Sequence, residues 1–251
     1  VCKNVASASI GVWELQIGMQ KGDGFQRGGV ITSSGLFTAR PAVGDYIAVD
    51  KTMDCADALD MAKDMKKSGL DTYAAYLSGG DWTVYVKDAS VSAVEAAADE
   101  NASRVSFEGV AITGGEAPVL VPENAVMMGG NVADTFKLNS MPGVNIIGLE
   151  EYLYGVVPSE MPKSYDAEAL KAQAVAARTY AMTKLGAHTG SGYQLCDTTA
   201  CQVYKGYSNE SDATTAAVAA TAGEVACYNG SPIEAVFSAS TGGYTESSEN
   251  V

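Results

Sequence analysis

The most informative stretch of the chain is Leu149-Glu-Glu-Tyr-Leu-Tyr-Gly-Val-Val-Pro-Ser-Glu-Met-Pro162. It begins as a short helix, which the two prolines are predicted to break because proline fixes φ and removes a backbone donor. Glu160 lies between these prolines, beside apolar Val156, Val157 and Met161. An apolar environment disfavours an ionised carboxylate and raises its pKa, so Glu160 is a candidate general acid. The alternative is a solvated glutamate in a turn.

A long alanine-rich helix follows this stretch. Asp166 is predicted to begin it, and it is expected to extend from Ala167 to about Leu185 before Gly186 ends it. Leu170, Ala174, Ala177 and Ala181 share one stripe, where the alanines let a neighbouring backbone approach closely. The helix also carries Lys171 and Arg178. An arginine at this place can hold an oxyanion or a carboxylate, and the alternative for both cations is an ordinary surface charge.

The part of the chain before this stretch is predicted to contain two units. Residues 1–44 form a β-rich start, because β-branched and aromatic residues are punctuated by glycines. Residues 45–108 form a small α/β unit of order β-α-β-β-α-β, whose helices Asp54 and Ser92 are expected to cap. This order, with the pattern Ala-Asp-Ala-Leu, Gly-Leu and Trp-Thr-Val-Tyr-Val, resembles the SPOR domain, a peptidoglycan-binding module.

Residues 109–251 are predicted to form a mixed α/β core. They contain further strands, the two helices described above, a helix over 209–222 and a hairpin around Asn229-Gly230. A polar loop, Ser238-Ala-Ser-Thr-Gly-Gly-Tyr244, follows, and binding sites are often built on such loops. The expected fold class is therefore α+β, with a β-rich start, an α/β insertion and a core built on the alanine-rich helix. Because the chain lacks an initial methionine and stops just after a dense motif, we expect a fragment that is shortened at both ends.

Two of the five cysteines are close enough in sequence to form a local bridge or a metal clip: Cys196 and Cys201. They can be free thiols, a disulfide or half of a zinc site. The single histidine, His188, precedes Cys196 by eight residues. Cys227, Asp197 or a water molecule could complete a set of metal ligands.

The charge balance, the lack of a long apolar run and the lack of certain motifs argue against several classes of partner and enzyme. Sixteen basic against thirty acidic residues leave a formal charge of −14, whereas nucleic acid and anionic membranes require a basic face. No run of about 18 apolar residues is present that could span a membrane. The chain has no Gly-x-Ser-x-Gly elbow, phosphate-binding loop or His-Glu-x-x-His motif, and a Ser-His-Asp or Cys-His hydrolase would have to use His188 as its base.

Several motifs together resemble the stage II sporulation protein D family, which also includes the amidase enhancers. They are the stretch quoted first, Glu168-Ala-Leu-Lys-Ala-Gln-Ala-Val-Ala-Ala-Arg-Thr-Tyr-Ala181, Asp197-Thr-Thr with Gln202-Val-Tyr-Lys-Gly206, and Phe237-Ser-Ala-Ser-Thr-Gly-Gly-Tyr-Thr-Glu-Ser247. Their order and spacing agree with the family over roughly residues 105–251. The small α/β unit is then an insertion in a family domain that is shortened at its C-terminus.

The resemblance implies a peptidoglycan lytic transglycosylase, which in the best-known members cuts strands stripped of their stem peptides. Glu160 is then the catalytic acid and base, and the reaction requires no cofactor. Arg178, Lys171 and Gln173 would support the site or bind glycan. The remaining substrate contacts are assigned to Tyr204, Ser238, Ser240, Thr241, Gly242 and Tyr244.

The resemblance also implies a structural zinc ion in some members, held by cysteine and histidine. The ligands here would be His188, Cys196 and Cys201. Ala200 stands where those members can carry a histidine, so the set of ligands would be incomplete.

Two other functions remain open. The amidase-enhancer branch allows a non-catalytic, glycan-binding enhancer or scaffold of a cell-wall amidase. A zinc-dependent amidase is the third reading, and the single histidine argues against it. The expected partners are glycan strands and a cell-wall amidase or other sporulation wall enzymes. The expected location is outside the cytoplasm, secreted or anchored through a segment absent from this chain.

Overall fold

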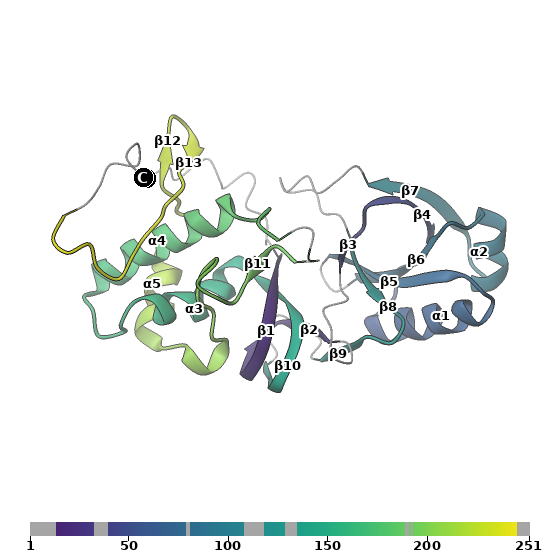
Figure 1. Cartoon of the computed structure of the whole chain (residues 1–251), viewed down its shortest axis with the longest axis horizontal. Coiled ribbons are helices and arrows are strands. Elements are labelled where there is room, and N and C mark those ends of the chain that lie inside the picture. Colours follow the sequence, from purple (N-terminus) through teal and green to yellow (C-terminus); the bar gives the residue numbers. More distant parts are fainter. Residues whose placement is uncertain are drawn as a thin grey trace.

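The computed structural model describes residues 14–32, 40–78, 81–107, 118–128, 135–188, 191 and 193–244. Within these ranges the strands form two larger sheets and one short hairpin, and helices pack beside each larger sheet. Figure 1 shows the C-terminal helices at one end of the molecule and the unit that contains residues 44–107 at the other. This arrangement confirms the predicted α+β class.

Two long antiparallel strands, β1 (Glu14–Arg27) and β10 (Thr135–Gly148), form the centre of the first sheet. The described strands of this sheet have the order β11-β1-β10-β2-β9. The outer strands are β2 (Gly29–Thr32), β9 (Val126–Met128) and β11 (Leu195–Cys196). The β-rich start of the chain is therefore completed by strands from distant parts of the sequence.

Strand β10 leads without a loop into α3 (Leu149–Glu160), which packs with α4 (Ala167–Thr183) and α5 (Asp212–Ala220). Asp166 caps α4 as predicted, because its carboxylate accepts a 2.9 Å hydrogen bond from the backbone N–H of Glu168. Apolar side chains of the strands and helices form a shared buried core that includes Leu15, Ile17, Ile147, Tyr152, Leu153, Val156, Ala174, Ala177 and Leu195.

The second sheet has six described strands in the order β3-β8-β5-β6-β4-β7. They are β3 (Arg40–Pro41), β4 (Gly44–Val49), β5 (Asp71–Ser78), β6 (Asp81–Lys87), β7 (Ala102–Phe107) and β8 (Val119–Pro122). Helices α1 (Cys55–Lys67) and α2 (Val91–Ala98) complete the predicted order β-α-β-β-α-β. Since β3 and β8 join the same sheet, it extends beyond residues 45–108. The SPOR resemblance and the domain limits stay predictions.

The caps of these two helices show where the sequence patterns succeed and where they fail. The carboxylate of Asp54 accepts a 2.9 Å hydrogen bond from the N–H of Asp57, as predicted. The predicted cap at Ser92 is wrong, because Ser90 has the extended backbone of a cap and its Oγ accepts from the N–H of Ala93.

The predicted helix break at Pro158 is also wrong. Helix α3 continues through Pro158 to Glu160 and ends at Met161, whose φ of −136° and ψ of 134° are extended. Pro158 removes one backbone donor from α3, whereas Pro162 disfavours a helical conformation at Met161, the residue before it. Glu160 is therefore the last residue of a helix rather than part of a loop between two prolines.

The chain after α5 forms the predicted hairpin, with very short strands. β12 (Cys227–Tyr228) and β13 (Ser231–Pro232) are antiparallel. Asn229 and Gly230 connect them with φ values of 48° and 82°, as a type I′ turn requires. None of the helices in the described ranges combines the length and the apolar character needed to cross a membrane.

Candidate active site

Glu160 presents a partly exposed carboxylate at the C-terminal end of α3. Its Oε1 accepts a 2.7 Å hydrogen bond from the backbone N–H of Val203. No described residue forms a hydrogen bond with the other oxygen, Oε2. One carboxylate oxygen is thus held in place by the backbone, and the partly exposed side chain has a second oxygen that forms no hydrogen bond with a described residue.

The segment 203–209 runs along the last turn of α3. Its far end, in the short helix η2 (Tyr207–Asn209), is held by a 2.9 Å hydrogen bond from Asn209 Nδ2 to Ser159 Oγ. Ser159 Oγ in turn donates to the carbonyl of Gly155 at 2.6 Å. Ser159 and Glu160 therefore hold the two ends of one short segment. No sequence pattern could indicate Val203 as a partner, because it contributes only its backbone.

Tyr204 is buried in the core and does not face a ligand, so its predicted contact with glycan is corrected. Its ring packs on Tyr152 with the ring centroids 5.2 Å apart, and its hydroxyl accepts a 3.2 Å hydrogen bond from Asn145 Nδ2. The Tyr152 hydroxyl donates to Gln202 Oε1 at 3.3 Å. Burial raises the pKa of both phenols well above the ordinary value, so both stay neutral. Tyr204 therefore packs against α3, which carries Tyr152.

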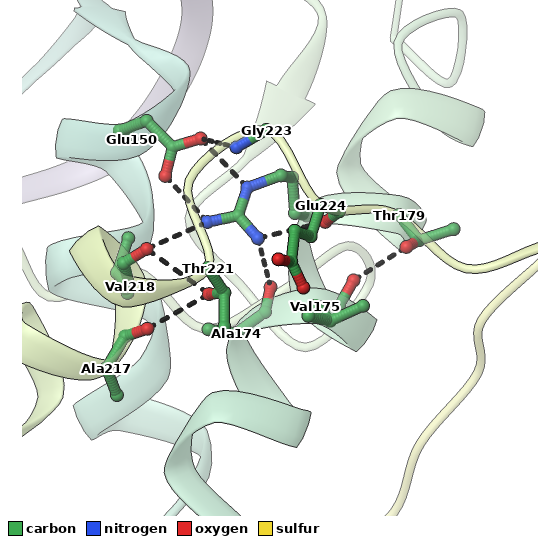
Figure 2. Close-up of polar contacts among 10 residues, drawn as sticks. Glu150, Ala174, Val175, Thr179, Ala217, Val218, Thr221, Gly223 and Glu224 are labelled. Carbon is green, nitrogen blue, oxygen red and sulfur yellow. Dashed lines mark hydrogen bonds and ion pairs between the residues drawn. The ribbon is translucent and has the colours of Figure 1, made fainter. Parts of the chain in front are cut away.

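Arg178 is fully buried on α4, so the prediction that it binds glycan is corrected as well. Its guanidinium is enclosed by protein acceptors, which Figure 2 labels as Glu150, Ala174, Val218 and Glu224. Nε and Nη2 contact the two carboxylate oxygens of Glu150 at 2.8 and 2.6 Å. The other acceptors are the carbonyls of Val218, Glu224 and Ala174, at 3.3, 3.1 and 3.5 Å. These contacts use the five N–H groups of an arginine, which leaves none for a ligand.

The arginine holds together three segments that are distant in sequence. Glu150, in the first turn of α3, also accepts from the N–H of Gly223. Nearby, Thr179 Oγ1 accepts a 2.9 Å hydrogen bond from the N–H of Ala226. The chain after α5 is therefore fixed to α3 and α4. Sequence reasoning missed Glu150, although a mid-helix arginine among alanines was a signal that a buried carboxylate partner is needed.

Lys171 and Gln173 lie on α4 in different environments. Lys171 Nζ lies 2.7 Å from Glu168 Oε1 at the surface. Gln173 is buried, and its Nε2 donates to no acceptor in the described ranges. Since the described contacts connect neither residue to Glu160, glycan binding by them stays a prediction.

The loop from Ser238 to Tyr244 is exposed and held mainly by its own turns. Ser238 Oγ donates to the carbonyl of Ser240, and the Tyr244 ring is 88% exposed. Phe237, just before the loop, packs its ring edge-on against Tyr180 of α4, with the centroids 6.1 Å apart. A glycan-binding role beside Glu160 stays a prediction for Ser238, Ser240, Thr241, Gly242 and Tyr244.

The structure brings the three predicted metal ligands together. The ligand atoms of His188, Cys196 and Cys201 all lie within 4.8 Å of one another, and Cys201 Sγ is 3.2 Å from His188 Nε2. The cysteines are not joined as a disulfide. Burial raises the pKa of the Cys201 thiol to about 11. Thiolate and imidazole donors about 3.5 Å apart suit tetrahedral zinc, so these residues fit that ion.

A close approach of two strands creates this cluster. Strand β11 pairs in parallel with β1, which places Cys196 opposite Gly18. A Cβ on Gly18 would lie 2.5 Å from the Tyr193 ring, so only glycine leaves room for that ring. Tyr193 then packs against the His188 ring, with the centroids 5.0 Å apart. Tertiary pairing therefore assembles ligands that sequence spacing could only suggest.

Comparison with known proteins shows which family part of this chain resembles. Residues 137–228, which include α3, α4, α5 and the three-ligand cluster, match the family described as Stage II sporulation protein. The resemblance inferred from the motifs is confirmed for these residues. The match covers Glu160 but not the unit built on α1 and α2.

Two relatives make the comparison specific. One is the amidase enhancer of Bacillus subtilis (strain 168), which is 56% identical over 99 residues, or 39% of this chain and 13% of the relative. Another is stage II sporulation protein D of the same organism, which is 41% identical over 121 residues, or 42% of this chain and 35% of the relative. The matched region thus spans about a third or less of the length of these relatives.

Proposed function

We propose that the chain is a peptidoglycan lytic transglycosylase in which Glu160 is the general acid and base. The observation that carries this proposal is the partly exposed carboxylate of Glu160, which Val203 fixes through one oxygen and whose other oxygen forms no hydrogen bond with a described residue. The similarity to stage II sporulation protein D supports a role in the cell wall. Two other carboxylates of α3 and α4 are engaged elsewhere, since Glu150 is paired with Arg178 and Glu168 with Lys171.

A single carboxylate is sufficient for this reaction. Protonated Glu160 donates its proton to the oxygen between N-acetylmuramic acid and N-acetylglucosamine, and the bond from that oxygen to the muramic anomeric carbon breaks. The resulting carboxylate removes the proton of the muramic 6-hydroxyl, whose oxygen attacks the same carbon. The products are a free 4-hydroxyl and a 1,6-anhydro end. Because the substrate provides the nucleophile, the second carboxylate of an ordinary glycosidase is not needed.

The test is cleavage of purified glycan strands, with anhydro-muramic ends detected by mass spectrometry. Glu160→Gln keeps the shape of the side chain but removes the proton, so activity should fall by at least ~100-fold. Glu168→Gln is the matched control, since it removes an exposed carboxylate from the adjacent helix and should leave cleavage unchanged. Anhydro ends formed at the same rate by Glu160→Gln would disprove the proposal.

The alternative is a non-catalytic enhancer of a cell-wall amidase. The name of the 56% identical relative, amidase enhancer, favours it. Stimulation of a purified amidase by wild type and Glu160→Gln alike, with no anhydro ends from either, would establish this alternative. Either function requires the protein to meet cell-wall glycan, so we propose that it acts outside the cytoplasm.

We further propose that His188, Cys196 and Cys201 hold a structural zinc ion. The ion would supply folding energy by linking the end of α4 to β11, and the transglycosylase reaction proceeds without it. Metal analysis should find about one zinc per chain, and chelation should lower the melting temperature. Cys201→Ser should lose the metal, whereas Cys55→Ser, on α1 and outside the cluster, should retain it. A protein purified without metal, whose melting is unaffected by added zinc, would exclude this site.

A further inference from the structure

One ion pair connects strand β1 to the segment whose backbone holds Glu160. Arg27, the last residue of β1, contacts both carboxylate oxygens of Glu210, with Nε 2.7 Å from Oε1 and Nη2 2.9 Å from Oε2. The side chain of Arg27 is 25% exposed and that of Glu210 is 10% exposed. A bidentate pair that is largely shielded from water holds both side chains in one geometry. Glu210 is therefore fixed to the end of β1.

The same guanidinium also contacts two tyrosine rings. The Cζ atom of Arg27 lies 4.7 Å from the ring centroid of Tyr207, in η2, and 5.9 Å from that of Tyr154, on α3. Both distances are within the range of a cation–π contact. Arg27 thus joins three parts of the fold: its own strand, helix α3 and the segment that follows Val203.

That segment, from Val203 to Glu210, is attached to the last turns of α3. The N–H of Val203 donates to Glu160 at 2.7 Å, and Asn209 Nδ2 donates to Ser159 Oγ at 2.9 Å. The N–H of Glu210 donates to the carbonyl of Tyr207 at 3.0 Å, which closes the turn at the end of the segment. The residue that holds the catalytic carboxylate and the residue that Arg27 holds are therefore the two ends of one short, folded segment.

Close packing in the middle of the segment links these two ends. A Cβ on Gly206 would lie 2.5 Å from Oε1 of Gln26, the residue before Arg27. The carbonyl oxygen of Gly206 would lie 3.4 Å from a Cβ on Gly155 of α3. The segment thus lies against both β1 and α3. Burial of the Tyr204 ring anchors its start and Arg27 anchors its end, whereas a segment that is held at its start alone can pivot.

We propose that Arg27 is a positioning residue for Glu160 and acts through Glu210 and the segment 203–210. This inference rests on the proposed function. By holding the end of the segment, Arg27 keeps the N–H of Val203 directed at Glu160, and a hydrogen bond weakens steeply when its angle changes. A general acid must stay within hydrogen-bond reach of the oxygen that it protonates, so its orientation affects the rate. Arg27 lies outside the matched residues 137–228, so β1 completes the site from a distant part of the chain.

The test measures the hydrogen bond of Val203 itself, by amide hydrogen exchange followed by NMR. Arg27→Met removes the charge but keeps an unbranched side chain, and should make exchange of the Val203 N–H about tenfold faster, because a segment released at one end opens more often. Its kcat on purified glycan strands should fall by about tenfold with KM nearly unchanged, since Arg27 acts on the orientation of Glu160 and not on ligand binding. Arg27→Lys keeps the charge without the bidentate geometry, so it should restore part of both quantities.

Two further variants separate positioning from a general loss of stability. Lys66→Met breaks an ion pair with Glu123 in the unit that contains α1, and should leave both the exchange of Val203 and kcat unchanged. The double variant Arg27→Met, Glu210→Gln should be no more impaired than Arg27→Met, because both changes act through the same contact.

Three results would overturn the inference. They are unchanged exchange of Val203 in Arg27→Met, exchange that becomes equally faster at the amides shared by β1 and β10, and an unchanged kcat where the wild type cleaves glycan. If Val203 exchanges faster as expected but the wild type forms no anhydro ends, the transglycosylase proposal fails, while the role of Arg27 in holding Glu160 stands.

Discussion

Replacing Arg178 by methionine should destabilise the protein strongly, because this side chain is fully buried and makes all its polar contacts within the protein. Breaking a buried ion pair by removing one partner costs about 3–5 kcal/mol. The side chain of Glu150 is 27% exposed, so water partly solvates the carboxylate that is left and the lower end of that range is expected. About 3 kcal/mol corresponds to a melting temperature lower by about 6–12 °C for a chain of this size.

Urea denaturation followed by circular dichroism measures this loss, and two further variants separate its causes. The double variant Glu150→Gln, Arg178→Met should be more stable than Arg178→Met alone, because it removes the unpaired carboxylate. Lys171→Met, which breaks an exposed ion pair on the same helix, should change stability by less than about 1 kcal/mol. An Arg178→Met protein that keeps wild-type stability but loses glycan binding would show that Arg178 contacts the ligand and would refute the structural role.

The remaining predictions concern α3 and a buried thiol. Gly155→Ala should destabilise the protein by about 1–3 kcal/mol in urea denaturation, since the added Cβ would lie 2.7 Å from the Tyr204 ring. A variant as stable as wild type would show that the Tyr204 ring can move away at no cost. Pro158→Ala should retain glycan cleavage, because α3 carries Glu160 to its end with or without the proline; loss of cleavage in a folded variant would restore a positioning role for the ring. Burial raises the pKa of Cys55 to about 12, so the folded state disfavours its thiolate. The neutral thiol therefore contributes stability below pH ~9 that is lost as pH rises toward 12. Between pH 8 and 10.5, Cys55→Ala should lose less stability than wild type. If the free energy of unfolding of the two proteins depends on pH in the same way, Cys55 is not the cause.

Local sequence signals predicted the elements that depend on local interactions. Asp54 and Asp166 cap their helices where expected, because a carboxylate accepting from the first turn needs only neighbours in sequence. The hairpin turn at Asn229-Gly230 depends equally on local backbone preference. The prediction at Pro158 failed, because packing of the apolar face of α3 against the core outweighs one lost backbone hydrogen bond.

The sequence by itself determined the family resemblance, the α+β class and the identity of Glu160 as the candidate acid. It also predicted the alanine-rich helix that carries Lys171, Gln173 and Arg178. It could not determine which polar residues of that helix face solvent. A buried arginine and an exposed lysine look alike when both recur at helical spacing, and only the approach of Glu150 and of the chain after α5 encloses Arg178. The contact of Glu160 with the backbone of Val203, and that of His188 with Cys201, also join segments that are separated in sequence. Such groups meet only when the chain folds and the apolar side chains of these segments pack into one core.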